Sequence, residues 1–160
     1  MKILEKIQIA RDMHAKLAGD LLTDPALMLG LETLLRESAL SRAVSVDCGI
    51  SEICRRCDEE EGGSCCGAGI ENRYTPELLL LNLLLGVDVP ETRQFEKSCQ
   101  FLGERGCLLA ARDIICINYL CARLRNAISE NSLNLLQEIN GREMTAVFVL
   151  HDMVRKRCRG

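Results

Sequence analysis

The chain has 160 residues, a net charge of −3 at pH 7 and 48% hydrophobic residues, a composition that favours one folded domain over a disordered chain. General polyanion binders carry the opposite charge, so the composition argues against nucleic acid as a partner. Aromatic residues make up 3% of the chain and Trp is absent, so aliphatic side chains must fill the core. The ten cysteines are the unusual feature.

Hydropathy predicts a cytoplasmic protein. Charged residues interrupt the apolar side chains of the first segment, whereas a secretory signal has a continuous apolar region. The longest apolar stretch, from Leu78 to Leu85, is far shorter than the ~20 residues that span a bilayer, so no membrane partner is expected. Because cytosolic thiols stay reduced, we interpret the cysteines first as metal ligands and not as disulfides.

Residues 1–47 contain no cysteine and have helical periodicity. Apolar residues from Ile3 to Leu21 recur at a spacing near 3.6, which is typical of an amphipathic helix. Thr23-Asp24-Pro25 then supplies an N-cap and a Pro at the first helical position, and we expect a second helix to about Ala39. These residues form the predicted N-terminal helical segment.

A third helix is predicted after the cysteine-free front of the chain. Thr75-Pro76 is a helix start of the same kind, and Gly86 is a natural stop. The leucines between them surround the helix almost completely, so this helix is expected to be deeply buried. Residues 44–46 and 87–89 are at most short extended pieces, and no stretch alternates for long enough to build a sheet.

The C-terminal helical segment spans residues 122–160, and Gly141 is expected to separate two helices within it. Between the two helical segments lies a Cys-rich centre, residues 48–121. The predicted fold class is therefore all-α. It is a small helical domain, compact overall, in which a metal-binding centre of loops and short helices is embedded.

The Cys-rich centre holds two groups of cysteines. The first group is a CxxC pair followed, after seven residues, by a vicinal pair with glycines on both sides. A CxxC pair lets two thiolates converge on one metal from a tight turn, and glycine permits close backbone approach. Eight cysteines are predicted to bind metal: Cys54, Cys57, Cys65, Cys66, Cys99, Cys107, Cys116 and Cys121.

Two spacings leave alternatives open. Neighbouring side chains diverge in an extended chain, so Cys65 and Cys66 either serve two metal centres, or one of them ligates while the other packs. On a regular helix Cys116 and Cys121 would lie about 140° apart. If both bind one centre, a helix should begin after Cys116 and hold Cys121 in its first or second turn. Residues 58–63 are expected to form an acidic connecting loop.

The order of these elements resembles the YkgJ-type cysteine-cluster proteins, a family described as a zinc- or iron-chelating domain. The resemblance covers roughly residues 50–122, and Asp113 stands where the family has Pro. It implies metal chelation and supplies no reaction. The matching elements are Cys54, Cys57, Cys65-Cys66, Cys99-Gln100-Phe101-Leu102, Gly106-Cys107, Arg112 to Cys116, and Cys121.

Eight thiolates suffice for two all-thiolate tetrahedral sites or for one four-thiolate cluster with packing thiols. The expected cofactor is an iron–sulfur cluster or zinc, with a slight preference for iron–sulfur, in a structural or redox role. The alternative is a helical protein-interaction module with a purely structural metal site, for which a protein partner would be needed. No catalytic residue set is recognised, so the sequence leaves open whether the chain is an enzyme and which small-molecule substrate it would use.

The histidines and the two remaining cysteines are not included among the predicted metal ligands. His14 and His151 are expected to be surface or packed imidazoles, because they lie on predicted helices far from the Cys-rich centre in sequence. Cys48 is either a ninth ligand or a buried thiol, and the second interpretation is favoured. Cys158 lies in a basic tail that is expected to be solvated. Arg105 and Arg112 are near predicted ligands and are candidates to offset thiolate charge.

Overall fold

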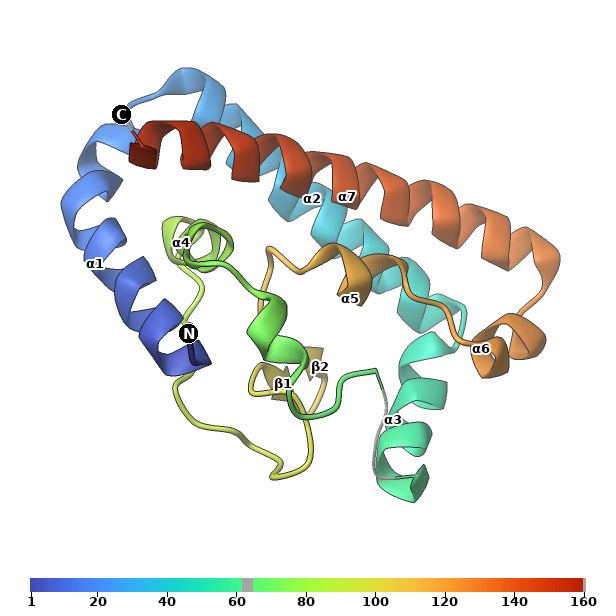
Figure 1. The fold of residues 1–160 in the computed structure, drawn as a ribbon. Coiled ribbons are helices and arrows are strands. Elements are labelled where there is room, and N and C mark those ends of the chain that lie inside the picture. The colour runs from blue at the N-terminus through green and yellow to red at the C-terminus, as the bar shows by residue number, and fades with distance from the viewer. Residues whose placement is uncertain (62–64, 160) are drawn as a thin grey trace.

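A computed structural model of the chain describes residues 1–61 and 65–159 (Figure 1). The described chain is mostly helical, as predicted. Its elements in order are α1 (Ile3–Leu21), α2 (Pro25–Asp47), α3 (Ile50–Glu61), the 3-10 helix η1 (Ile70–Arg73), α4 (Pro76–Leu84), β1 (Leu102–Gly103), β2 (Gly106–Cys107), α5 (Ile114–Asn118), α6 (Ala122–Ala127) and α7 (Glu130–Arg159).

The long helices α2 and α7 pack side by side along their length, and α1 packs against α4 (Figure 1). Apolar side chains from these four helices meet in the main hydrophobic cluster, where Leu34 and Leu150 are fully buried. In water, most helical stability comes from such packing and little comes from intrinsic propensity. The N-terminal and C-terminal helical segments thus build one core together.

Helix α4 is deeply buried, as its leucines predicted. Leu79, Leu80 and Leu81 have no exposed surface, and neither does the polar Asn82. The Asn82 amide donates to the carbonyl oxygens of Leu78 and Ala111, and its oxygen accepts from the backbone N–H groups of Ala110 and Ala111. Asn82 therefore fixes the chain that leads from the hairpin to α5.

Several predicted boundaries were wrong. Helix α2 continues past Ala39 to Asp47, so residues 44–46 are helical. Helix α7 passes through Gly141 without a break, and α3 is helical over residues 58–61, which were expected to form a loop. In α2 and α7, packing of each helix against the other outweighs the local stop signals. Residues 62 and 63 lie outside the described part.

A smaller hydrophobic cluster lies where α3, α6 and the start of α7 meet. Its buried members are Ile50, Leu120, Leu124 and Leu136. Gly49, with φ at 76°, provides the left-handed turn that separates α2 from α3 and directs α3 toward this cluster. In the part of the chain that the structure describes, no helix is both long enough and apolar enough to cross a membrane.

Candidate functional site

The CxxC pair lies on helix α3 and not in the tight turn that was expected. Cys54 and Cys57 are three residues apart, so they share one face of the helix, and both side chains are half-buried. The opposite face is exposed and carries Arg55 and Arg56, which form ion pairs with Glu52 on the same helix. Helix α3 therefore directs both thiols toward the body of the protein.

The vicinal pair is attached to the segment that precedes the hairpin. The Cys99 backbone N–H donates to the Cys66 carbonyl at 2.6 Å, and Ala68 N–H donates to the Lys97 carbonyl at 3.0 Å. Gly67 and Ser98 form an isolated antiparallel bridge between these hydrogen bonds. Cys65 is exposed, whereas Cys66 is half-buried.

Strands β1 and β2 form an antiparallel hairpin that holds Cys107 directly opposite Leu102. Cys99 precedes the hairpin, is 6% exposed and accepts a hydrogen bond at its sulfur from the Phe101 backbone N–H at 3.4 Å. Gly106 turns the chain with φ at 106°. An N–H group that faces a sulfur stabilises a thiolate, so the Cys99 position suits a negatively charged ligand.

Cys116 and Cys121 lie on separate short helices. Cys116 is in α5, whose N-cap Asp113 accepts from the Ile115 backbone N–H at 3.0 Å. Asp113 thus starts a helix at the position where the resembling family has Pro. Cys121 is the N-cap of α6 and so precedes that helix, instead of lying in the first or second turn of a helix that follows Cys116. The two sulfurs consequently belong to different surroundings.

Cys54, Cys57, Cys65 and Cys121 are neighbours in space and are called the α3 group. The pKa of the Cys54 thiol is raised to about 11, first by burial and then by the negative charge that the other three sulfurs would carry. Cys54 and Cys121 also pack against the smaller hydrophobic cluster. The α3 group therefore brings Cys121 together with cysteines more than 50 residues earlier in the sequence.

Cys66, Cys99, Cys107 and Cys116 form a second set, called the hairpin group. Burial and then Cys107 raise the pKa of Cys116 to about 12, and burial raises the pKa of Cys99 to about 11 with a further contribution from Cys107. Cys99 and Cys107 belong to the main hydrophobic cluster, not to the smaller one. The eight predicted ligands thus divide into two sets of four.

The vicinal pair lies at the boundary between the two groups. A hydrogen bond between the two side chains lowers the pKa of Cys65 and raises that of Cys66. The pKa of Cys66 is raised further by burial and by Cys116 and Cys107, which belong to the hairpin group. Cys65 interacts instead with Cys54 of the α3 group.

Tyr74 lies near the hairpin group. Its side chain is 1% exposed, and its ring contacts the Phe101 ring edge-on at 5.0 Å between centroids. A hydrogen bond from Tyr74 to the Cys116 sulfur opposes the rise in the pKa of that thiol. Sequence reasoning missed Tyr74, although the residue directly precedes the predicted helix start at Thr75-Pro76.

Two arginines place positive charge near Cys107. Arg42 on α2 donates from Nη1 to the Cys107 carbonyl at 2.7 Å and also donates to the Leu109 carbonyl. Arg112, which the sequence suggested, is half-buried, forms an ion pair with Glu143 and lies near enough to Cys107 for their charges to interact. Arg105 is exposed. The role of Arg42 could not be predicted from the sequence, because no local pattern indicates that α2 packs against the hairpin.

Within each group, the sulfurs of the described residues do not converge on one point. Within residues 1–61 and 65–159, no three His, Cys, Asp or Glu side chains lie close enough together to hold a metal ion. The donor set nevertheless suits a soft metal, since each group offers four sulfurs and since N–H and O–H donors point at some of them. Binding would require the side chains of each group to move together.

The remaining histidines and cysteines have structural environments. His151 shares a hydrogen bond with the Thr75 hydroxyl at 3.0 Å, beside the start of α4, while His14 is a half-buried residue of α1. Cys48 packs against the smaller cluster. Cys158 packs against the main cluster, and burial followed by the Glu77 charge raises its pKa.

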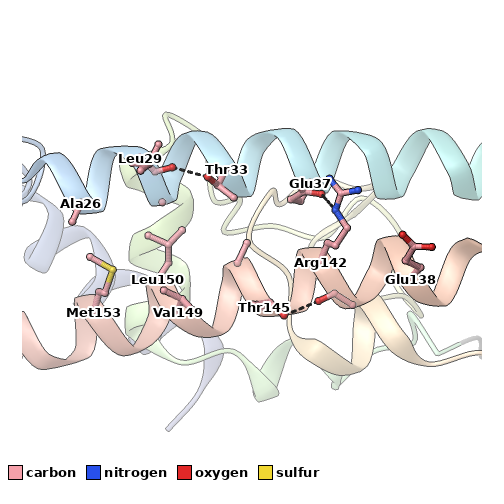
Figure 2. Close-up of a pocket in the computed structure, with 13 residues that line it drawn as sticks. Ala26, Leu29, Thr33, Glu37, Glu138, Arg142, Thr145, Val149, Leu150 and Met153 are labelled. Atoms are coloured by element: carbon pink, nitrogen blue, oxygen red, sulfur yellow. Dashed lines mark hydrogen bonds and ion pairs between the residues drawn. The ribbon is translucent and has the colours of Figure 1, made fainter.

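An open groove of about 560 Å³ runs between α2 and α7 (Figure 2). Glu37 and Arg142 form an ion pair across it. The hydroxyl groups of Thr33 and Thr145 are used in hydrogen bonds to carbonyl groups of their own helices. The groove is therefore lined by small and apolar residues together with polar groups, of which Glu37, Arg142, Thr33 and Thr145 are already paired.

Comparison with family models, with curated proteins and with solved structures gives no match for this chain. The resemblance to the YkgJ-type proteins consequently rests on the order of the sequence elements given above.

Proposed function

We propose that the protein binds metal through the thiolates of its Cys-rich centre, as an iron–sulfur protein or a zinc protein with a structural or redox role. One observation carries the proposal: cysteines from α3, the vicinal pair, the Cys99–hairpin segment, α5 and α6 interact electrostatically in two sets of four. Packing of apolar cysteines alone would not require thiols from five segments to form such sets.

The segments that carry the cysteines need additional stabilisation. The hairpin has two residues in each strand, and α5 and α6 have five and six residues. Helices of this length are marginal in water without tertiary contacts. Structural zinc sites provide about 10–16 kcal/mol of apparent binding free energy, comparable to the ~5–15 kcal/mol that stabilises a whole domain. Metal binding would therefore hold these segments in place.

The raised pKa values of Cys54, Cys99 and Cys116 add a pH dependence. Without metal these thiols hold their protons at neutral pH, and a metal must displace those protons when it binds. Metal affinity should therefore rise with pH. Arg42 and Arg112 lie near Cys107 and would offset part of the negative charge that remains after a divalent ion binds four thiolates.

The test is anaerobic purification followed by elemental analysis and a visible absorption spectrum. An iron–sulfur protein will contain iron and sulfide and will be coloured, and its colour will bleach on reduction if the cluster is redox-active. A zinc protein will be colourless with stoichiometric zinc. Cys107→Ser should lower the metal content, whereas Cys158→Ser, at the end of α7, should not. A folded wild-type protein that contains neither metal, with all its thiols free, would contradict the proposal.

Chelation gives an independent measurement. Most helical residues lie in α1, α2, α4 and α7, which share the main hydrophobic cluster. Removal of metal should therefore leave most of the helical circular dichroism signal. It should increase amide hydrogen exchange across residues 65–127. Uniform exchange changes over the whole chain would indicate that the metal does not act on these segments in particular.

A further inference from the structure

We infer that the eight cysteines form two adjoining four-thiolate metal centres and that the vicinal pair is divided between them. Cys65 joins the α3 group, and Cys66 joins the hairpin group. This inference rests on the proposed metal binding and adds the number of centres and the ligands of each.

The first argument concerns the vicinal pair itself. Side chains of consecutive residues diverge in an extended chain, but Cys65 and Cys66 lie in a turn and a hydrogen bond joins their side chains, so the division rests on what surrounds each residue. In the structure the two residues already differ in their surroundings, since Cys65 is exposed and Cys66 is half-buried. The Cys66 carbonyl is also fixed by the Cys99 N–H at 2.6 Å, which places Cys66 beside a member of the hairpin group.

The second argument is that the two groups belong to different hydrophobic clusters. Cys54 and Cys121 pack against the smaller cluster between α3, α6 and α7. Cys99 and Cys107 belong to the main cluster, together with Tyr74 and Phe101. Sulfurs embedded in separate cores can converge locally within each group. A single four-thiolate centre that drew ligands from both groups would have to break the packing of one cluster.

The third argument concerns how the centres stay adjacent. The Ser98 hydroxyl donates to the Asp58 carboxylate, so α3 is joined to the residue next to Cys99. The Gly67–Ser98 bridge holds the chain after the vicinal pair against the same segment. The two groups are thus tied together by backbone and side-chain contacts that do not use the sulfurs.

The two centres should differ in accessibility. The α3 group includes the exposed Cys65, whereas the hairpin group includes the buried Cys99 and lies near the buried Tyr74. A chelator reaches exposed ligands first. The α3 centre should therefore lose its metal before the hairpin centre does, whether the metal is zinc or iron.

Paired substitutions test the division. Cys57→Ser and Cys121→Ser should each remove half of the wild-type metal, and the double variant within this group should still retain the other half. Cys107→Ser with Cys116→Ser should likewise retain half. Cys57→Ser combined with Cys107→Ser, one residue from each group, should remove all of it. Cys48→Ser and Cys158→Ser are controls that should retain full metal content by native mass spectrometry and elemental analysis.

A measurement on the wild-type protein covers the case in which a variant fails to fold. Partial chelation followed by rapid alkylation and peptide mapping should label Cys54, Cys57, Cys65 and Cys121 first. The four cysteines of the hairpin group should remain protected until the second half of the metal leaves. Simultaneous labelling of Cys65 and Cys66, or loss of all metal from both within-group double variants, would overturn the division. Absence of metal from the wild-type protein would instead refute the proposed function.

Discussion

The Ser98 hydroxyl lies 3.2 Å from Oδ2 of Asp58 and donates a hydrogen bond to that carboxylate. This contact joins the half-buried face of α3 to the buried segment that precedes the hairpin. The two residues are 40 positions apart, so the bond closes the part of the chain that contains the vicinal pair. Removing this hydrogen bond therefore tests how much the contact between α3 and the hairpin segment stabilises the protein.

Ser98→Ala should destabilise the as-purified protein by about 1–3 kcal/mol, because a partly buried hydrogen bond to a carboxylate is lost. Urea unfolding followed by circular dichroism measures the change in the free energy of unfolding. Ser51→Ala, on the exposed face of α3, is the control and should change the free energy of unfolding by less than about 0.5 kcal/mol. Equal midpoints for the two variants would show that the Ser98 bond does not stabilise the docking of α3.

The ion pair between Arg112 and Glu143 connects the α5 segment to α7. Arg112 donates from Nε and Nη2 to the two carboxylate oxygens at 3.0 and 2.5 Å, and the Glu143 side chain has no exposed surface. Glu143→Gln leaves the guanidinium buried without its counter-charge and should cost about 3–5 kcal/mol in unfolding free energy.

The double variant Arg112→Met with Glu143→Leu should recover most of that loss, because it removes both buried charges together. Asp152→Asn on the same helix breaks the exposed pair with Lys156 and should lower the unfolding free energy far less than Glu143→Gln does. A Glu143→Gln variant as stable as Asp152→Asn would show that the buried pair contributes no more than a surface pair.

The sequence predicted the helices best where periodicity and capping agree. Asp24-Pro25 and Thr75-Pro76 do start α2 and α4, and the burial of α4 follows from its leucines. It failed where tertiary packing decides, as at Gly141, which lies inside α7 because α2 supports that helix along its length.

The candidate ligands could be selected from their spacing, but their grouping could not. Cys116 and Cys121 are close in sequence, yet they interact with different groups because α5 ends between them. Arg42 is 65 residues from Cys107 and reaches it only because the hairpin folds back onto α2. No local pattern encodes contacts of that kind, since they depend on the arrangement of whole helices.

Glu37 gives the protein a specific acid sensitivity. Hydrogen bonding from Arg142 lowers its pKa below the ordinary value of 4.5, although burial opposes the shift. The folded state therefore holds the ionised form more strongly than the unfolded state does. The stabilisation is fully present above pH 4.5 and is lost as the pH falls through the pKa of the folded state.

Urea unfolding at several pH values tests this dependence by comparison with Glu37→Gln, which has no charge at position 37. The difference in stability between the wild type and this variant should be constant from neutral pH down to about pH 5 and should shrink below pH 4.5. Arg142→Gln removes the partner that α7 provides for Glu37. The loss of stability caused by this substitution should therefore also decrease as Glu37 takes up a proton. A wild-type advantage that grows on acidification would mean the assigned direction is wrong.

Substitution by Ala should have opposite effects on stability at Gly141 and at Gly30, although both residues line the groove between α2 and α7. A Cβ atom at Gly141 would have no heavy atom within 4 Å, so Gly141→Ala should stabilise α7 by about 0.5–1 kcal/mol through reduced backbone entropy. At Gly30 the added Cβ would lie 2.6 Å from Cδ2 of Leu150, a fully buried side chain with little room to move. Overpacking in Gly30→Ala should therefore cost about 1–3 kcal/mol of unfolding free energy. The higher helix propensity of Ala offsets part of this loss. Thermal unfolding of the two variants should shift the midpoint in opposite directions, and a rise for Gly30→Ala equal to that for Gly141→Ala would show that α2 and α7 are not closely packed at this point.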